Sequence, residues 1–249
     1  MIKIVHNNTQ NTQSIISELK SFGSEERAKH SLRFFKTGPG QYGEGDIFYG
    51  ATVPEIRNVA RKYKDVALDD VQELLKNKYH ECRLVALMIL VEKYEKSRTD
   101  LDKKIIYELY LHNSKYINNW DLVDLSAHKI VGAYLYNKDE KGKNRDRSIL
   151  YKLAKSKDLW EKRISIISTF YFIYRKDFND SLKISEILVD DKHDLIQKAV
   201  GWMLREVGKR DQNVEEEFLK KYHKTMPRTM LRYAIEKFDD KKKKFYMSK

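Results

Sequence analysis

Apolar residues recur along the chain every three or four positions, the spacing of helices with one buried face. The gaps between these segments are short, and no segment is assigned to a strand. The predicted helices cover residues 12–22, 25–37, 53–64, 68–78, 80–97, 99–113, 119–136, 145–157, 159–176, 179–191, 193–210, 213–224 and 227–238. Consecutive helices with short connections pack as antiparallel hairpins, so the pattern predicts an all-α fold of about six helical hairpins.

A weak internal repeat indicates how these hairpins are arranged. Five predicted helices each place one polar residue before a short apolar stripe. The five polar residues are Arg83, Asp124, Arg163, Lys198 and Arg232, which gives spacings of 41, 39, 35 and 34 residues. Repeats of this length are typical of HEAT and armadillo-like proteins, whose hairpins bury their apolar faces by stacking on one another. We therefore expect an αα-solenoid that forms a single domain over residues 1–249, with 1–12 and 240–249 as mobile termini.

Charge and composition narrow the class of partner. The 249 residues carry 49 Lys and Arg against 37 Asp and Glu, a formal net charge of +12, which favours a polyanion such as nucleic acid over an acidic membrane surface. The single Cys82 excludes an internal disulfide, the histidines lack metal-ligand spacing, and no metal or cofactor is expected. The sequence has no run of about 18–20 apolar residues and no signal-peptide core, so we expect no membrane contact and a cytoplasmic location. We further expect a monomer that acts at the nucleoid.

The repeat-equivalent positions suggest a binding face. In a solenoid the second helix of each hairpin usually lines the concave surface, so Arg83, Arg163, Lys198 and Arg232 are predicted to form a basic column that meets DNA phosphates. Asp124 places a carboxylate in the same column, where it would repel phosphates. Either this acid has a functional role, or it caps or salt-bridges its own helix.

Several motifs resemble the AlkD family of DNA alkylation repair proteins, and the similarity extends from about Phe34 to Phe238. It rests on two N-terminal motifs, a WDxVD segment, an LWEKR segment and a GWxLRE segment. These are Phe48-Tyr49-Gly50, Val53-Pro54-Glu55-Ile56-Arg57, Asn119-Trp120-Asp121-Leu122-Val123-Asp124, Leu159-Trp160-Glu161-Lys162-Arg163 and Gly201-Trp202-Met203-Leu204-Arg205-Glu206. The resemblance implies HEAT-like repeats and an alkylpurine DNA glycosylase that acts on double-stranded DNA containing alkylated bases and does not flip the lesion.

The family pattern also implies roles for single residues. Asp124 matches the catalytic carboxylate, which would stabilise positive charge on the deoxyribose as the glycosidic bond breaks. Trp120 and Trp202 match aromatic walls whose indole faces attract a cationic N3- or N7-alkylpurine. Arg163 matches an arginine that holds a backbone phosphate, for which a planar bidentate donor is well suited.

Other interpretations of these residues stay open. The tryptophans could be packing residues, Trp160 is expected in the core or groove wall, and Phe170, Tyr171, Phe172 and Tyr174 are expected to be core. The glycine-rich segment 38–46 lacks the GK[ST] ending of a phosphate loop and is predicted to be a structural loop, with a DNA-edge role as the alternative. The run Lys241 to Lys244 is expected to be a solvated tail.

At the level of the whole protein, two alternatives to a glycosylase exist. One is a non-catalytic binder of damaged or unusual DNA, against which the retained Asp124, Trp120, Trp202 and Arg163 argue. The other is a HEAT-like scaffold for protein partners, whose groove need not be basic.

Overall fold

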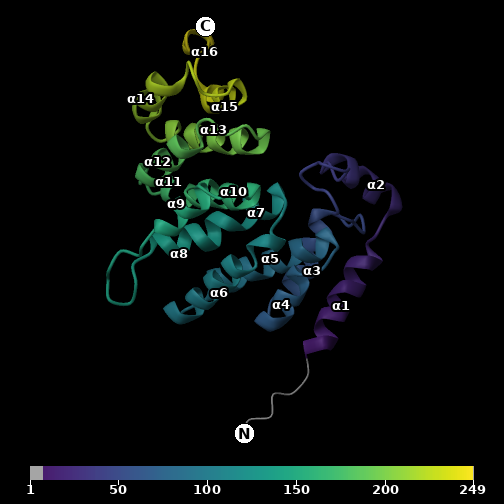
Figure 1. Cartoon of the computed structure of the whole chain (residues 1–249). Coiled ribbons are helices and arrows are strands. Elements are labelled where there is room, and N and C mark those ends of the chain that lie inside the picture. Colours follow the sequence, from purple (N-terminus) through teal and green to yellow (C-terminus); the bar gives the residue numbers. More distant parts are fainter. Residues whose placement is uncertain (1–7, 249) are drawn as a thin grey trace. The chain divides into compact units, whose positions relative to one another are not determined.

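The computed structural model describes residues 8–248, most of which form helices (Figure 1). Most connections between the helices are short, and the longer ones cover residues 35–52 and 137–147. No strand occurs among these residues, and an isolated bridge pairs Ile47 with Tyr79. The predicted all-α class is therefore confirmed. By its internal contacts the chain divides into two compact units, the first ending at Ser126 and the second beginning at Ala127.

The first unit is built around one helix that is buried on most sides. Its helices are α1 (Asn8–Ser21), α2 (Glu25–Phe34), α3 (Val53–Lys62), α4 (Leu68–Leu75), α5 (His80–Lys96), α6 (Asp100–His112), η1 (Ser114–Tyr116) and α7 (Trp120–Ala127). Helix α5 packs against α1, α3, α4 and α6. Its residues Cys82, Val85, Leu87 and Leu90 are fully buried. A helix that is apolar on several faces occupies the centre of a helical unit.

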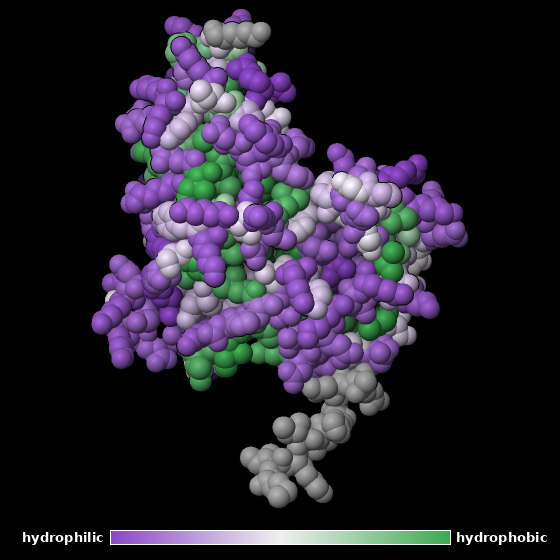
Figure 2. All heavy atoms as spheres, viewed as in Figure 1, coloured by the Kyte–Doolittle hydropathy of each residue, from purple (hydrophilic) through white to green (hydrophobic). Residues whose placement is uncertain are grey.

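The second unit repeats this plan around α13. Its elements are η2 (His128–Gly132), α8 (Ala133–Tyr136), α9 (Ser148–Ala154), α10 (Leu159–Ser168), α11 (Phe170–Ile173), α12 (Asn179–Leu188), α13 (Asp194–Gly208), α14 (Gln212–Tyr222), α15 (Arg228–Ala234), η3 (Ile235–Lys237) and α16 (Asp240–Met247). Helix α13 contacts α10, α12, α14 and α15. On the face seen in Figure 2, hydrophilic side chains cover most of the surface, and hydrophobic side chains show between the helices of this unit. The apolar faces are thus buried by stacking, as helical repeats require.

Side-chain hydrogen bonds explain where several helices begin. Ser24 accepts from the backbone N–H of Arg27 at the start of α2, and Asp158 accepts from Trp160 at 2.7 Å at the start of α10. Such caps satisfy N–H groups that have no partner within the helix. The sequence places these caps within a residue of the predicted helix starts.

One predicted long helix is interrupted, and another contains a turn of different geometry. The prediction of one helix over 159–176 is wrong because α10 ends at Ser168 and α11 begins at Phe170. The Ser168 hydroxyl donates to the Ile164 carbonyl at 2.6 Å and the Thr169 hydroxyl donates to the Ile166 carbonyl at 2.7 Å, bonds that compete with regular helix geometry. The segment predicted as 119–136 contains the π-helical turn η2, a type of turn frequent at functional sites.

Residues Asp240–Met247 form helix α16 in the part of the chain that was predicted to be a tail. Asp239 caps α16 by accepting from the Lys242 backbone N–H, and Lys242 pairs with Glu216. Tyr246 anchors the helix, with only 2% of its surface exposed. At the N-terminus α1 already begins at Asn8, whereas residues 1–7 of the predicted mobile segment lie outside the described part of the chain.

Candidate functional site

Helix α7 carries both Trp120 and Asp124 in the first unit. The two residues are four positions apart, so their side chains leave the same face of the helix, and both are partly exposed. Asp124 lies close enough to Tyr110 to affect its hydroxyl: burial raises the pKa of Tyr110, and the negative charge of Asp124 raises it further. An indole and a carboxylate are thereby presented together on one helix.

A buried amide fixes the start of α7. Asn119 is fully buried, and its side-chain oxygen accepts from the Trp120 backbone N–H at 2.8 Å. Its side-chain nitrogen donates to Asp46 Oδ2 at 3.2 Å. The position of Trp120 therefore depends on Asp46, which is 73 residues away from Asn119 in the chain.

His80 stands at the centre of the same buried network. Its Nδ1 lies 3.1 Å from Asp46 Oδ2 and its Nε2 lies 2.8 Å from Asp121 Oδ2, so a protonated ring donates to both carboxylates. Burial alone would lower the pKa of His80, but the charge of Asp121 and the hydrogen bonds to both acids raise it to about 9. Both ring nitrogens are engaged, so His80 is an imidazolium that bridges two acids.

Asp46 is kept ionised by the same partners. Burial alone would raise its pKa, but the hydrogen bond from His80 and the positive charges of Arg83 and His80 outweigh burial and lower it. The carboxylate is 5% exposed and forms an ion pair with Arg83. The glycine-rich segment 38–46 thus delivers a buried acid to the network, which supports its interpretation as a structural loop.

Aromatic rings pack around Trp120. The Phe34 ring lies 5.9 Å from the Trp120 ring at a steep angle, and the Phe35 ring lies 5.6 Å away. Phe35 in turn stacks on Phe48 at 5.3 Å, and Phe48 stacks on His80 at 4.9 Å. A ring cluster therefore connects the exposed indole to the buried imidazolium.

In the second unit, Trp202 belongs to another aromatic cluster. The Phe170 ring lies 5.5 Å from Trp202, and Tyr174 lies 4.7 Å from Phe170. The His128 ring contacts Phe170 at 5.4 Å, and the Arg210 guanidinium lies 4.2 Å from the Tyr174 ring centre. Trp202 is partly exposed, so its indole is accessible to a ligand.

The rings of α10 and α11 are only partly in the core. Trp160 and Phe172 are buried, with 8% and 0% of their surfaces exposed. Tyr174, which was predicted to be a core residue, is 60% exposed because it lies past the end of α11, where the chain turns. Phe170 is partly exposed and faces Trp202.

Two of the predicted phosphate-binding arginines are buried, in contrast to expectation. Arg83 is 4% exposed and is held by Asp46 and by the carbonyl of Asn77 at 3.0 Å. Arg163 is 5% exposed and donates to the Leu195 carbonyl at 2.6 Å, which ties α10 to the first turn of α13. Neither guanidinium is presented to a phosphate in this structure, because internal acceptors already hold them.

The other two basic positions are accessible in the second unit. Lys198 lies on α13, where its Nζ pairs with Asp194 at 2.7 Å while 38% of its side chain stays exposed. Arg232 is exposed on α15. Both side chains are therefore at least partly accessible to solvent.

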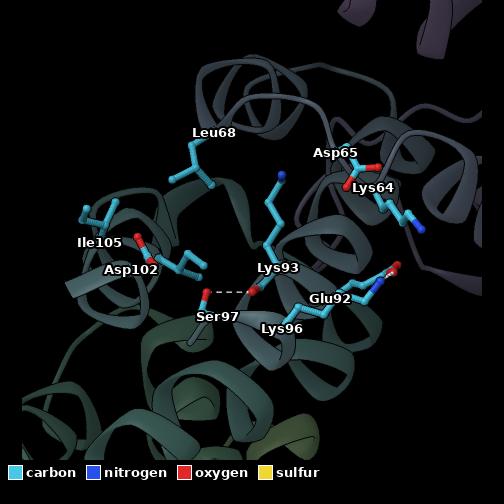
Figure 3. Close-up of a pocket in the computed structure, with 10 residues that line it drawn as sticks. Lys64, Asp65, Leu68, Glu92, Lys93, Lys96, Ser97, Asp102 and Ile105 are labelled. Carbon is cyan, nitrogen blue, oxygen red and sulfur yellow. Dashed lines mark hydrogen bonds and ion pairs between the residues drawn. The ribbon is translucent and has the colours of Figure 1, made fainter. Parts of the chain in front are cut away.

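A separate pocket of about 310 Å³ lies between α4, α5 and α6 in the first unit (Figure 3). The Lys93 amine points into it between Leu68 and Asp65, and burial lowers the pKa of this amine. The other charged groups that line it are Lys64, Lys96, Asp65, Glu92 and Asp102. Three amines and three carboxylates balance, so this pocket does not favour a polyanion.

Sequence reasoning missed most of the buried network. Asp121 lies within the WDxVD segment, but nothing in the spacing of Asp46 and His80 indicates that they meet. The aromatic contacts of Phe35 and Phe48 likewise come from segments that only the fold brings together. Within residues 8–248, no cluster of His, Cys, Asp and Glu side chains is suited to hold a metal, and no helix is long and apolar enough to cross a bilayer.

Comparisons with known proteins agree with this architecture. The family described as "DNA alkylation repair enzyme" matches residues 15–238. A predicted DNA alkylation repair enzyme from Enterococcus faecalis is similar in structure, with a TM-score of 0.64 at 14% identity over 88% of this chain and 97% of that chain. AlkD2 from Streptococcus mutans gives a TM-score of 0.52 at 16% identity over 92% of this chain and 99% of that chain. At such identities the structural matches establish the fold, and no curated protein matches the chain.

Proposed function

Because the chain belongs to the DNA alkylation repair enzyme family, we propose that it is a DNA glycosylase that releases cationic N3- and N7-alkylpurines from duplex DNA. The lesion would stay within the duplex during the reaction. The observation that carries this proposal is the pairing of Trp120 and Asp124 on one face of α7. Both residues are partly exposed, and Asn119 holds the start of their helix.

The chemistry needs little acid catalysis. An N7- or N3-alkylpurine already carries positive charge, so it leaves as a neutral base when the C1′–N bond breaks and takes the bonding electrons. Positive charge then develops on the deoxyribose, water adds to C1′ and loses a proton, and an abasic site results. A carboxylate held in place beforehand stabilises such a developing charge without reorganisation, which is the role proposed for Asp124.

The indoles supply selectivity for charged lesions. An indole face attracts a cation by roughly 0.5–2 kcal/mol and offers much less to a neutral purine. Trp120 in the first unit and Trp202 in the second are both accessible enough for this role. The Phe35 and Phe170 rings contact the two indoles, with ring centres 5.6 and 5.5 Å away.

Phosphate binding is assigned to accessible cations. Lys198 and Arg232 are the repeat-equivalent basic residues that stay exposed in the second unit. Arg163 acts in this proposal as a positioning residue, since its hydrogen bond to the Leu195 carbonyl orders the start of the helix that carries Trp202. The net charge of +12 adds general attraction to DNA.

The test is single-turnover release of 7-methylguanine from methylated duplex DNA. Asp124→Asn should slow release by about 10²- to 10³-fold, the usual effect of losing one preorganised electrostatic group. Its affinity for the same duplex should be unchanged or slightly higher, because a repulsive charge is gone. Glu95→Gln, an exposed position on α5, is the matched control for the change in charge and should release the base at the wild-type rate.

Equal rates for wild type and Asp124→Asn would contradict the proposal. Asp124 would then be a structural acid. A protein that binds the methylated duplex without any release in either form would be a DNA binder.

A further inference from the structure

A second candidate site lies beneath α2, entirely within the first unit. A pocket of about 480 Å³ opens between α2 and the start of α3, a size typical of small-molecule sites. Its lining includes Arg27 and Ser31 from α2, Thr52 and Val53 at the start of α3, and the residues Phe35, Phe48, His80 and Asp121. Helix α2 has no buried residue, so it covers this space without filling it.

Flat rings form one boundary of the pocket. Phe35 and Phe48 stack at 5.3 Å with planes only 11° apart, and His80 stacks on Phe48 at 4.9 Å. Phe35 and Phe48 are both partly exposed, so ring surface is available to a ligand. An aromatic pocket of this kind favours a planar ligand that can stack on a phenyl ring.

The charged groups of the pocket make it unfavourable for a phosphate. The Arg27 guanidinium donates to the carbonyls of Gly50 and Phe22 at 2.6 and 2.7 Å, and His80 is held by Asp46 and Asp121. Glu81 accepts from the backbone N–H groups of Tyr49 and Gly50 and adds negative charge. Arg27 and His80 are therefore engaged by internal acceptors, and Glu26 adds a further carboxylate to a lining that also contains His30.

Asp121 supplies hydrogen-bond acceptors at the pocket. One oxygen accepts from His80 and the other accepts from the Leu122 backbone N–H at 2.9 Å. A carboxylate has about four lone-pair sites, and 19% of this side chain is exposed, so it has capacity for further donors. A ligand with N–H groups along one edge of a flat ring matches both the stacking surface and the carboxylate.

We propose that the pocket beneath α2 binds a purine ring, stacked on Phe35 or Phe48, with its N–H edge directed to Asp121. Guanine-type rings, which present adjacent N–H donors, fit best. The ring could come from a free base after excision or from an unpaired purine in DNA. The choice of a purine rests in part on the proposed function, whereas the ring and carboxylate arguments rest on the first unit alone.

The position of the pocket relates it to the indole on α7. Asp121 follows Trp120 directly, and the Phe35 ring that borders the pocket lies 5.6 Å from the Trp120 ring. A purine in the pocket would thus be separated from the Trp120 face by the Phe35 ring. It would occupy a site of its own, next to the residues assigned to catalysis.

The test measures purine binding without any excision step. Equilibrium dialysis with radiolabelled 7-methylguanine gives the affinity for the free base. Competition by a duplex with one unpaired guanine gives the affinity for an unpaired base, and the fully paired duplex is the reference for that competition. Ser31→Trp should fill the pocket and weaken binding at least tenfold. Leu32→Trp is the matched control, because Leu32 is exposed on the same helix and does not line the pocket.

The outcomes separate the sources and the proposals. If Ser31→Trp binds the free base more weakly than wild type does, the released base is a ligand of the pocket. If Ser31→Trp binds the free base normally but the duplex with an unpaired guanine no longer competes, the ligand is an unpaired purine in DNA. No binding to wild type, or equal binding by Ser31→Trp and wild type, overturns the pocket, provided circular dichroism shows that the variant folds. Phe48→Leu, which removes ring surface without adding volume, should also weaken binding.

Failure of the proposed function gives a different result. Asp124→Asn should bind 7-methylguanine as wild type does, since Asp124 does not line the pocket. A protein that binds 7-methylguanine but releases no base from DNA would therefore contradict the proposed glycosylase activity and leave the pocket proposal intact. Inorganic phosphate, added at constant ionic strength, should not compete with 7-methylguanine for binding.

Discussion

The Trp120 cluster and the Trp202 cluster present similar indoles but are held in different ways. Around Trp120, the ring cluster is held by buried charges, with Asp46 and His80 at the centre. Around Trp202, the positions of the rings depend on close helix packing. A Cβ built on Gly201 would lie 2.4 Å from the Met230 carbonyl oxygen, and one built on Gly132 would lie 2.2 Å from the Ser168 carbonyl oxygen.

This difference predicts different sensitivities. A buried charge network is strong only while each member keeps its partner and its protonation state. A close approach of two helices has no such dependence, but any added atom must displace backbone. We therefore expect the first unit to respond to charge and pH at its network and the second to respond to volume at its glycines.

The largest effect is expected from Arg83→Met. The substitution removes one of the two cations that pair with the buried Asp46 carboxylate and leaves only His80. Breaking a buried ion pair typically destabilises by about 3–5 kcal/mol. Urea unfolding measures the loss, and hydrogen exchange should show it in α7 and not in α13. Equal deprotection of both helices would break the distinction between the two clusters.

A pH series should show an effect of nearly the same size. The pKa of His80 is about 9 in the folded protein against an ordinary 6.5, so its contribution is complete below pH 6.5 and is lost as pH rises to about 9. That difference corresponds to on the order of 3 kcal/mol. The groups that face His80 are Asp46, Asp121 and Arg83.

A second buried group titrates over an overlapping range in the other unit. Burial raises the pKa of Glu215 to about 9, so its neutral form is favoured and stability falls as pH rises above 4.5. The comparison of wild type with His80→Gln at pH 6 and pH 9.5 therefore isolates His80. If the stability of the α7 region falls by the same amount between pH 6 and pH 9.5 in both proteins, His80 is not the group responsible.

A smaller effect is expected from Gly201→Ala. The new methyl group would lie within 2.6 Å of the Tyr233 Cβ as well as close to the Met230 carbonyl, and such overpacking destabilises by about 1–3 kcal/mol. Hydrogen exchange should increase in α13 and α15 and stay unchanged in α7. If Gly201→Ala unfolds with the same free energy as wild type, α13 and α15 can move apart without loss of stability, and close packing does not hold the Trp202 cluster.

The smallest effect is expected for DNA affinity. Lys198→Gln combined with Arg232→Gln should lower the slope of log affinity against log salt by about 1.8, which is about 0.9 for each lost phosphate contact. Lys220→Gln, an exposed position on α14, serves as the control for charge. An unchanged slope in the double variant would remove both residues from the DNA interface.

Periodicity alone determined most of the fold. The three-to-four spacing of apolar residues predicted helices close to those observed, because burial of one helix face leaves a local trace in the sequence. The proximity of Trp120 and Asp124 could be predicted for the same reason, since residues four positions apart on one helix are close in space whatever the rest of the fold does. The caps at Ser24 and Asp158 are local signals too.

Tertiary structure decided what pairs over long distances. Arg83 was indistinguishable in sequence from the exposed Arg232, yet it is buried because Asp46 from a distant loop meets it. Nothing in the spacing of the chain links His80 to Asp46 and Asp121, or brings Phe35 against Phe48 beneath α2. Charge pairing and ring stacking depend on through-space distance, which a linear pattern records only when the partners lie on the same helix.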